Sequence, residues 1–385
     1  MRMLLADPQL QAELGPLYVP EEFEAALSAA AAAHDVNLPA GAVASLNRPD
    51  VLGLSRWEAA PVELDGWPGP GWLPARAVPS GGAPAIDWAW FGDEPLRDPF
   101  FEGAVRRATA LPMNRLLRTR TTIEALVAGY RAEPEVRLDG LIFHLSRCGS
   151  TLIAQMLMAA PSNHVLSEPE PFDAVLQWAA LSGVPQDEAV LALRAIVAAM
   201  GRQRQQAGGG YVIKLDAWHL LSLPLLRAAF PDTPWLFVFR NPVEILVSLG
   251  WMPGAGATHG ALTTSLANIP DAESLSLTAY AGEYLARLCE SALDHWHLGG
   301  GLAVDYRDLP GAVTDQIARH FNLHPGAADL AAMTAAGAMD AKAPDRKFAP
   351  DTQSKQQAAN AEQRDIAERR LAGLYVRMQE LRAQT

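Results

Sequence analysis

Residues 140–152 read GLIFHLSRCGSTL, and this stretch carries most of the functional information in the chain. Its apolar part, Leu141–Leu145, is short enough for a buried strand, and a tight polar turn of small residues follows at 146–151. The pattern from Leu152 to Ala160 predicts a helix that Pro161 stops. A strand, a small-residue loop and a helix N-terminus bring unpaired backbone N–H groups and the positive end of a helix dipole to one point. The stretch therefore predicts a phosphate- or sulfate-binding site.

The side chains of the turn also suit an anion. Gly149 lets the backbone close on the ligand, and the hydroxyls of Ser150 and Thr151 add hydrogen-bond donors. Arg147 adds a fixed positive charge, and Cys148 lies between Arg147 and the glycine. The alternative is a helix N-cap that binds nothing.

Two common phosphate loops do not fit this turn. The Walker pattern needs a Lys before the Ser and an earlier glycine, and both are missing. A phosphatase that uses Cys148 as nucleophile needs an Arg about six residues later, and Ala154 stands there. The anion is therefore held by another type of loop.

Composition limits the classes of partner. The chain has 385 residues with 49% hydrophobic and 19% charged residues, which indicates a folded globular protein. Its net charge of −12 argues against nucleic acid and against an anionic membrane as partners. An anionic ligand must then be held by a local group of Arg and Lys side chains.

Cysteine usage and hydropathy indicate where the protein works. Cys148 and Cys289 are the two cysteines, so we expect no disulfide framework and a reducing compartment. Cys and His residues show no metal-ligand spacing. We find neither a signal-peptide pattern nor an apolar stretch of about 20 residues, the length a membrane span needs. These features predict a soluble cytoplasmic protein without a metal cofactor.

The pattern along the chain predicts three parts. Residues 1–48 are expected to form a small helical unit, and the Trp/Pro-rich segment 49–137 is expected to form short strands and helices that pack on the core. Residues 138–385 alternate apolar runs with helical patterns. The expected strands include 211–215, 235–239 and 302–304, which predicts an α/β domain with a mainly parallel sheet and helices on both faces.

Two further cations follow expected strands of this domain. Lys214 ends the run at 211–213, and Arg240, in Arg240-Asn241-Pro242, follows the run at 235–239. Side chains at the carboxyl ends of parallel strands point into the crevice where ligands bind. Ser248, two helical turns after Arg240, can return to the same anion. The alternatives are an Arg240 paired with a neighbouring carboxylate such as Glu244 and a Lys214 whose ammonium reaches solvent.

The loop and the two cations together resemble sulfotransferases that use 3′-phosphoadenosine 5′-phosphosulfate (PAPS), in particular the bacterial and tyrosylprotein branches. The resemblance covers about residues 138–360 and implies a P-loop NTPase-like fold. It implies that residues 147–151 bind the 5′-phosphosulfate and that Arg240 and Ser248 bind the 3′-phosphate. It also implies that Lys214 and Arg147 act on the departing side of the sulfuryl group, without a metal.

The same resemblance suggests the base. In the tyrosylprotein branch a Glu in the loop after the second strand removes the acceptor proton, and Glu168 occupies that loop here. In cytosolic enzymes a His in the Lys-bearing strand does this, but Asp216 stands at that position. Asp216 and His219 are the alternatives to Glu168, which could also be a structural carboxylate.

Two more residues match elements of that family. Tyr306, in Asp305-Tyr306-Arg307-Asp308-Leu309, matches a Tyr that meets the adenosine portion of the donor. Lys355, preceded by Ser354, lies in a poorly periodic segment where the family places a loop that closes over the donor. The alternative for Lys355 is a solvated charge.

The sequence thus predicts a sulfotransferase that transfers a sulfuryl group from PAPS, leaving 3′,5′-ADP, to a hydroxyl or amine of an unknown small-molecule or peptide acceptor. The alternatives are a nucleotide-dependent phosphotransferase with a degenerate loop and an inactive nucleotide-binding module. In residues 1–48, the order DPQL at 7–10 and HDVNL at 34–38 resembles Nif11-like leader segments.

Overall fold

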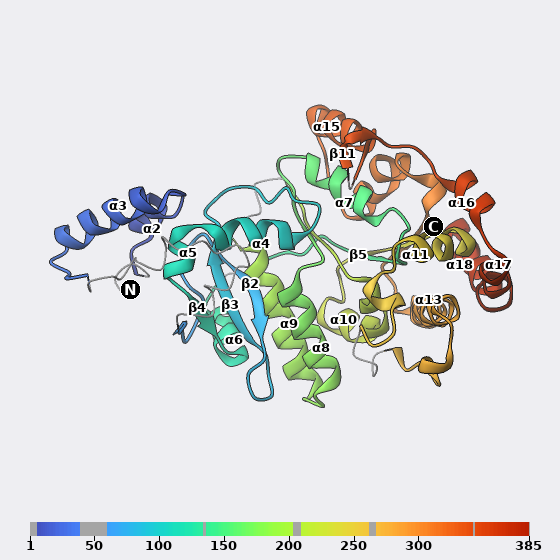
Figure 1. Cartoon of the computed structure of the whole chain (residues 1–385), viewed down its shortest axis with the longest axis horizontal. Helices are drawn as coiled ribbons and strands as arrows, with labels where there is room; N and C mark the ends of the chain where they lie inside the picture. The colour runs from blue at the N-terminus through green and yellow to red at the C-terminus, as the bar shows by residue number, and fades with distance from the viewer. Residues whose placement is uncertain are drawn as a thin grey trace. The chain divides into compact units, whose positions relative to one another are not determined.

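The computed structural model describes residues 6–38, 60–133, 136–202, 209–261, 267–341 and 343–384. The chain forms two compact units. Unit 1 comprises Met1–Val136 and Pro169–Arg204, and unit 2 comprises Arg137–Glu168 and Gln205–Thr385. Figure 1 shows the course of the chain in colour from blue to red.

Unit 2 is built on a five-stranded sheet in which every neighbouring pair is parallel. Its strands are β5 (Gly140–His144), β6 (His164–Ser167), β7 (Tyr211–Lys214), β8 (Trp235–Phe239) and β9 (Gly301–Asp305), in the order β6-β7-β5-β8-β9. All residues of β5, β6, β7 and β8 are buried. Because successive side chains of a strand point to opposite faces, both faces of this sheet are covered. The predicted α/β fold with a mainly parallel sheet is confirmed.

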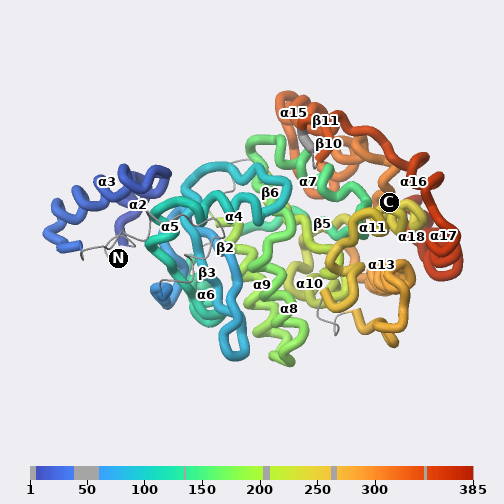
Figure 2. The backbone as a smooth tube through the Cα atoms, in the orientation of Figure 1, coloured from blue at the N-terminus to red at the C-terminus, as the bar shows by residue number. Residues whose placement is uncertain are grey.

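The helices of unit 2 begin with α7 (Ser150–Ala159), directly after the anion loop. The others are α10 (Leu223–Ala229), α11 (Pro242–Trp251), α13 (Leu277–Asp294), α14 (Ala318–His320), α15 (Ala327–Gly337), α16 (Thr352–Ala358), α17 (Ala361–Ile366) and α18 (Ala372–Gln384). A short hairpin, β10 (Met339–Asp340) and β11 (Ala343–Lys347), follows α15. Helix α15 packs on α7, and α13 packs on α18, as Figure 2 shows. Tyr375 of α18 donates to the buried Asp305 carboxylate at 2.8 Å, which fastens α18 to the end of β9.

Unit 1 contains a smaller, mostly antiparallel sheet. Its strands are β1 (Val62–Glu63), β2 (Trp72–Val78), β3 (Ala85–Trp90) and β4 (Thr119–Thr121), in the order β1-β4-β3-β2. Its helices are α2 (Pro8–Leu14), α3 (Pro20–Ala33), α4 (Phe101–Ala110), α5 (Pro112–Leu116), α6 (Ile123–Ala132), α8 (Glu170–Leu181) and α9 (Gln186–Gly201). The indoles of Trp72 and Trp88 are buried and donate to Gln11 and Thr121, both at 2.9 Å. These two tryptophans therefore serve packing.

The division into units differs from the domains predicted from the sequence. Helices α8 and α9 lie inside the segment 138–385, but they group with unit 1, where α8 packs on β2 and α9 on α6. Arg202, which follows α9, lies 5.1 Å from the Trp67 ring centroid and donates to the Pro68 carbonyl at 2.9 Å. Periodicity predicts that a helix has an apolar face but does not name the surface that covers it. The predicted boundary at residues 48 and 49 lies outside the described residues, and the Nif11 resemblance stays a prediction.

Among the described residues, we find no helix with the length and apolar character that crossing a membrane requires.

Candidate functional site

The candidate site of unit 2 lies at the carboxyl ends of its five parallel strands, where ligands of open α/β sheets bind. Each strand is followed, or ended, by one predicted site residue or, after β5, by a loop of five. They are residues 147–151 after β5, Glu168 after β6, Lys214 at the end of β7, Arg240 after β8 and Tyr306 after β9. The parallel register thus brings residues that are up to about 160 positions apart in the chain to one edge of the sheet.

The loop after β5 has the backbone shape of an anion-binding loop. Arg147 (φ +64°) and Gly149 (φ +88°) both adopt the left-handed conformation, and helix α7 starts directly after Gly149. Such a turn points successive N–H groups into one concavity. A Cβ atom on Gly149 would lie 2.7 Å from Leu309 Cδ1 and 3.0 Å from Tyr306 Cδ2, so this close approach requires glycine.

Cys148 contributes to this loop as a thiol. Its side chain is buried and donates to the Leu145 carbonyl. Burial raises the pKa of the Cys148 thiol to about 12, so no thiolate forms at neutral pH. The cysteine therefore fits a structural role in the loop.

Arg147 and Ser248 are in direct contact, although 101 residues separate them. The Arg147 Nε donates to the Ser248 hydroxyl at 2.8 Å, and Ser248 is buried on α11. The loop predicted for one phosphate therefore adjoins the serine predicted for the other.

Arg240 is the centre of the charged network. Its guanidinium carbon lies 3.7 Å from the Tyr306 ring centroid, and its Nη1 donates to the Arg147 carbonyl at 3.4 Å. Its Nε donates to Glu244 at 2.6 Å, and its Nη2 donates to Asp351 at 2.5 Å. The pairing with Glu244 that the sequence leaves open is thus present. It uses the Nε of Arg240, and the Nη2 of the same guanidinium donates to Asp351.

Lys214 and Glu168 form an ion pair beside His144. The Lys214 side chain is 1% exposed, and its ammonium contacts the Glu168 carboxylate. His144 Nε2 lies 3.6 Å from the same carboxylate oxygen and 2.9 Å from the Leu215 carbonyl oxygen. Burial alone would raise the pKa of Glu168, but the His144 imidazole and the Lys214 ammonium outweigh it and lower the pKa to about 2. Glu168 is therefore ionised at neutral pH and held on Lys214.

The two alternative bases have local structural contacts. The Asp216 backbone N–H donates to His219 Nδ1 at 3.2 Å, and the two residues form a capping box on the short helix Ala217–Ser222. His219 is buried. Glu168, by contrast, contacts Lys214 directly.

Two residues of the network, His144 and Asp351, have no role in the sequence prediction, and Glu244 enters it only as a possible partner of Arg240. A polar His inside the apolar run 141–145 is a signal for the first. The spacing of four residues between Arg240 and Glu244, and between Asp351 and Lys355, is a signal for the other two. Lys355 lies on α16 and not in a loop, which differs from the prediction.

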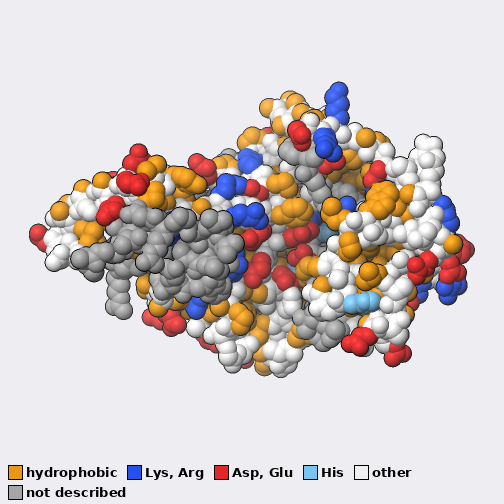
Figure 3. Space-filling view, in the orientation of Figure 1, with side chains coloured by type: hydrophobic (Ala, Val, Ile, Leu, Met, Phe, Trp, Pro, Cys, Tyr) orange, Lys and Arg blue, Asp and Glu red, His pale blue; other side chains and the backbone are white. Residues whose placement is uncertain are grey.

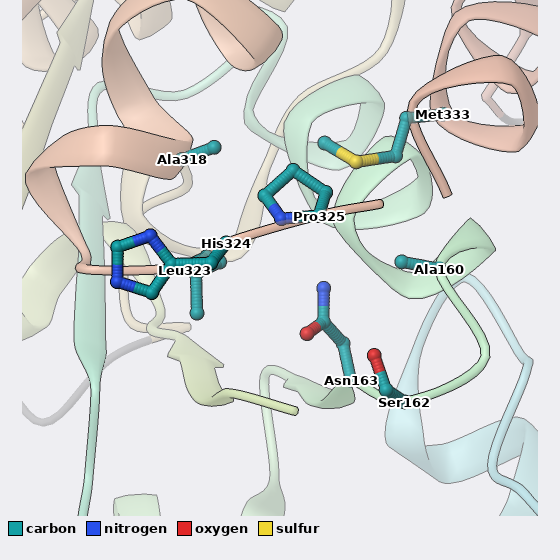
Figure 4. A pocket seen from close by; sticks show the side chains of 8 residues that line it. All are labelled: Ala160, Ser162, Asn163, Ala318, Leu323, His324, Pro325 and Met333. Carbon is teal, nitrogen blue, oxygen red and sulfur yellow. The ribbon is translucent and has the colours of Figure 1, made fainter. Parts of the chain in front are cut away.

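Two hollows elsewhere do not suit an anionic nucleotide. The one in Figure 4, lined by Asn163, His324 and Met333 among others, has a volume of about 10 Å³, enough for one water molecule at most. A larger one in unit 1, of about 440 Å³, lies between the β2–β3 turn and α8. Its lining includes Glu170 and Asp173 but no Lys or Arg.

Charges of both signs lie interspersed on the face of the molecule shown in Figure 3. Positive and negative side chains are also paired in the candidate site, where Lys214, Arg240 and Lys355 each contact a carboxylate. An anionic ligand would therefore have to compete with these carboxylates for the cations.

Neither a protein-family model nor a curated protein sequence matches the chain. Solved structures do resemble it, and three of them are sulfotransferases. Sulfotransferase STF1 from Mycobacterium tuberculosis H37Rv has 18% identity and a TM-score of 0.39, covering 60% of this chain and 80% of that chain. Sulfotransferase STF9 from Mycobacterium avium has 14% identity and a TM-score of 0.36, and the match covers 61% of this chain and 80% of that chain. The sulfotransferase domain of the Synechococcus PCC 7002 olefin synthase has 15% identity and a TM-score of 0.35, and the match covers 61% of this chain and 95% of that chain.

Proposed function

We propose that the chain is a sulfotransferase that uses PAPS as donor and a hydroxyl or amine as acceptor. One observation carries this proposal: a loop with the shape of an anion site, an ion pair of the buried Lys214 with Glu168 and a second Arg site lie at the carboxyl ends of neighbouring parallel strands. The loop would bind the 5′-phosphosulfate, and the Lys–Glu pair would act on the leaving group and on the acceptor proton. The third, around Arg240, suits a second phosphate on the same ligand.

The residues present fit this donor. The left-handed backbone at Arg147 and Gly149 gives the loop the shape of an anion site, and Tyr306 presents an aromatic ring beside Gly149. Residues 147–151 would hold the 5′-phosphosulfate, and Arg240, Ser248 and Lys355 the 3′-phosphate. When bound, the donor supplies the sulfuryl group and a phosphate leaving group.

The chain's own residues would then act on charge and on a proton. Lys214 and Arg147 neutralise negative charge on the departing oxygen, and Glu168 accepts the proton of the acceptor hydroxyl. In the free protein Lys214 lowers the pKa of Glu168. When Lys214 turns to an anionic ligand, Glu168 loses part of this stabilisation and becomes a stronger base. The Lys–Glu pair thus couples donor binding to activation of the base.

We propose that the acceptor is a small molecule or a peptide. We also propose that neither nucleic acid nor a membrane is a partner. We also propose a cytoplasmic location, which the free, buried cysteines Cys148 and Cys289 support.

The test of the donor is binding of 3′,5′-ADP. We expect an affinity in about the micromolar range, unchanged by EDTA, together with a higher Tm, because two phosphates find two separate sets of cations. Calorimetric titrations with ATP-Mg²⁺ and GTP-Mg²⁺ run in parallel. If ATP-Mg²⁺ stabilises the protein more than 3′,5′-ADP does, the phosphotransferase alternative replaces the sulfotransferase. Binding of 3′,5′-ADP without any turnover would favour an inactive module.

Arg240→Ala is expected to weaken 3′,5′-ADP by about 10- to 100-fold, from the loss of roughly 1.5–3 kcal/mol of charge-assisted contact. Adenosine 5′-phosphosulfate, which lacks the 3′-phosphate, should lose little affinity. The control is Arg369→Ala, which removes an equal charge from the exposed pair with Asp365. Because Glu244 is left buried, Tm is measured for every variant. Equal weakening of both ligands would place Arg240 elsewhere in the site.

A further inference from the structure

Asp351 occupies an unusual place for an N-cap residue. It precedes α16 at the N-cap position, yet its side chain forms no cap hydrogen bond with the helix. Asp is among the best N-cap residues because its carboxylate accepts from the first backbone N–H groups. Here the carboxylate has turned to other partners.

Those partners form a set that suits a phosphate. Oδ1 of Asp351 accepts from Arg240 Nη2 at 2.5 Å and from the Tyr306 hydroxyl at 3.4 Å, and Oδ2 contacts Lys355 Nζ at 2.6 Å. Arg240 and Lys355 are 3% and 4% exposed, whereas the Asp351 side chain is 42% exposed. The two cations are thus fixed in the protein, and the carboxylate reaches them from the solvent side.

Burial explains why the cations need an anion. Desolvation of a buried ammonium lowers the pKa of Lys355, and the Asp351 carboxylate opposes this effect. Two buried cations around one carboxylate would repel each other without it. The Asp351 carboxylate between Arg240 and Lys355 therefore stabilises both positive charges in the free protein.

We propose that the Asp351 carboxylate fills the 3′-phosphate position of the free protein and gives way to that phosphate on donor binding. This inference rests on the proposed function. A phosphate monoester carries up to two charges and three acceptor oxygens, so it can replace a single carboxylate on the same cations. A nucleotide without the 3′-phosphate cannot, and it leaves Asp351 in place. A ligand with a 3′-phosphate therefore spends part of its binding free energy on displacing Asp351, and a ligand without that phosphate does not.

The test compares two ligands on three variants by calorimetry. The ligands are 3′,5′-ADP, which carries the 3′-phosphate, and adenosine 5′-phosphosulfate, which lacks it and carries a sulfate on its 5′-phosphate. The variants are Asp351→Asn, Asp351→Ala and the control Asp365→Asn, which removes the same charge from the exposed pair with Arg369. Asp351→Asn keeps the size and the N-cap capacity of the side chain, and Tm of each free protein reports on folding.

Loss of the competing carboxylate should tighten 3′,5′-ADP about tenfold in both Asp351 variants. Adenosine 5′-phosphosulfate should change less than about twofold, and the control variant should match the wild type for both ligands. If the wild type binds 3′,5′-ADP and the Asp351 variants bind it equally or more weakly, the inference is overturned and the proposed function stands. Equal tightening of both ligands also overturns it, because the carboxylate would then act only through the general field. If neither wild type nor variants bind 3′,5′-ADP, the proposed function itself fails.

Discussion

Replacing Lys214 by Met is expected to lower the turnover of sulfuryl transfer by about 10²-fold or more. The affinity for 3′,5′-ADP should change far less. Lys214 is proposed to meet negative charge that develops as the bond from sulfur to the leaving oxygen breaks, so its contribution is larger in the transition state than in the bound state. Met keeps most of the volume of this fully buried side chain and removes its charge.

The measurement does not need the natural acceptor. In the reverse direction, p-nitrophenyl sulfate and 3′,5′-ADP give PAPS and p-nitrophenolate, whose absorbance reports turnover. The double variant Lys214→Met/Glu168→Gln is the folding control, since it removes both charges of the buried pair and leaves no unpaired carboxylate. If Lys214→Met is well folded and keeps near-normal turnover, the proposed mechanism is wrong, while the fold is unaffected.

The sheet of unit 2 could be predicted from the sequence because parallel strands buried on both faces are continuous apolar runs. The run at 235–239 coincides with β8, and those at 211–215 and 302–304 match β7 and β9 within one residue at each end. The site residues could be found for a related reason. A polar side chain directly after such a run lies at the carboxyl edge of the sheet, and Arg147, Lys214 and Arg240 all do.

The partners of these cations could not be predicted in the same way. Glu168 and Lys214 are 46 residues apart, and Arg240 and Asp351 are 111 apart, so their pairing depends on tertiary geometry. Pro-containing sequence around Lys355 suggests a loop, but packing of α16 on α11 gives a short helix instead. The assignment of α8 and α9 to unit 1 could not be predicted either. The sequence of a helix indicates that it has an apolar face but not which part of the protein covers that face.

The pairs give the site one common property. Each of its buried cations Lys214, Arg240 and Lys355 meets a carboxylate in the free protein, so its charge is largely balanced before any ligand arrives. Binding of an anion is then an exchange of one anion for another and not a simple addition. Such a site discriminates between ligands by the number and position of their charges, which suits a protein with a net charge of −12.

Glu168→Gln should lower turnover by about 10²- to 10⁴-fold for acceptors with a high hydroxyl pKa, the usual range for loss of a general base. In the reverse direction the same carboxyl donates a proton to the departing phenol oxygen. A series of substituted phenyl sulfates therefore tests the role of Glu168. Proton donation matters least for p-nitrophenol, which leaves readily as the anion, and most for unsubstituted phenol. We expect the loss in Glu168→Gln to grow along this series, while the loss in Lys214→Met is large for every member.

The comparison of the two variants separates proton transfer from positioning. Glu168 also holds Lys214 in place through their ion pair, so its replacement could act through the lysine alone. That case predicts an equal loss for every phenyl sulfate, because the position of Lys214 does not depend on the leaving group. The result is read from a plot of log kcat against the pKa of the phenol. Parallel lines for wild type and Glu168→Gln would mean that Glu168 does not transfer the proton. Lines that diverge as that pKa rises require a proton at Glu168 in the transition state, because only proton transfer scales with the basicity of the departing oxygen.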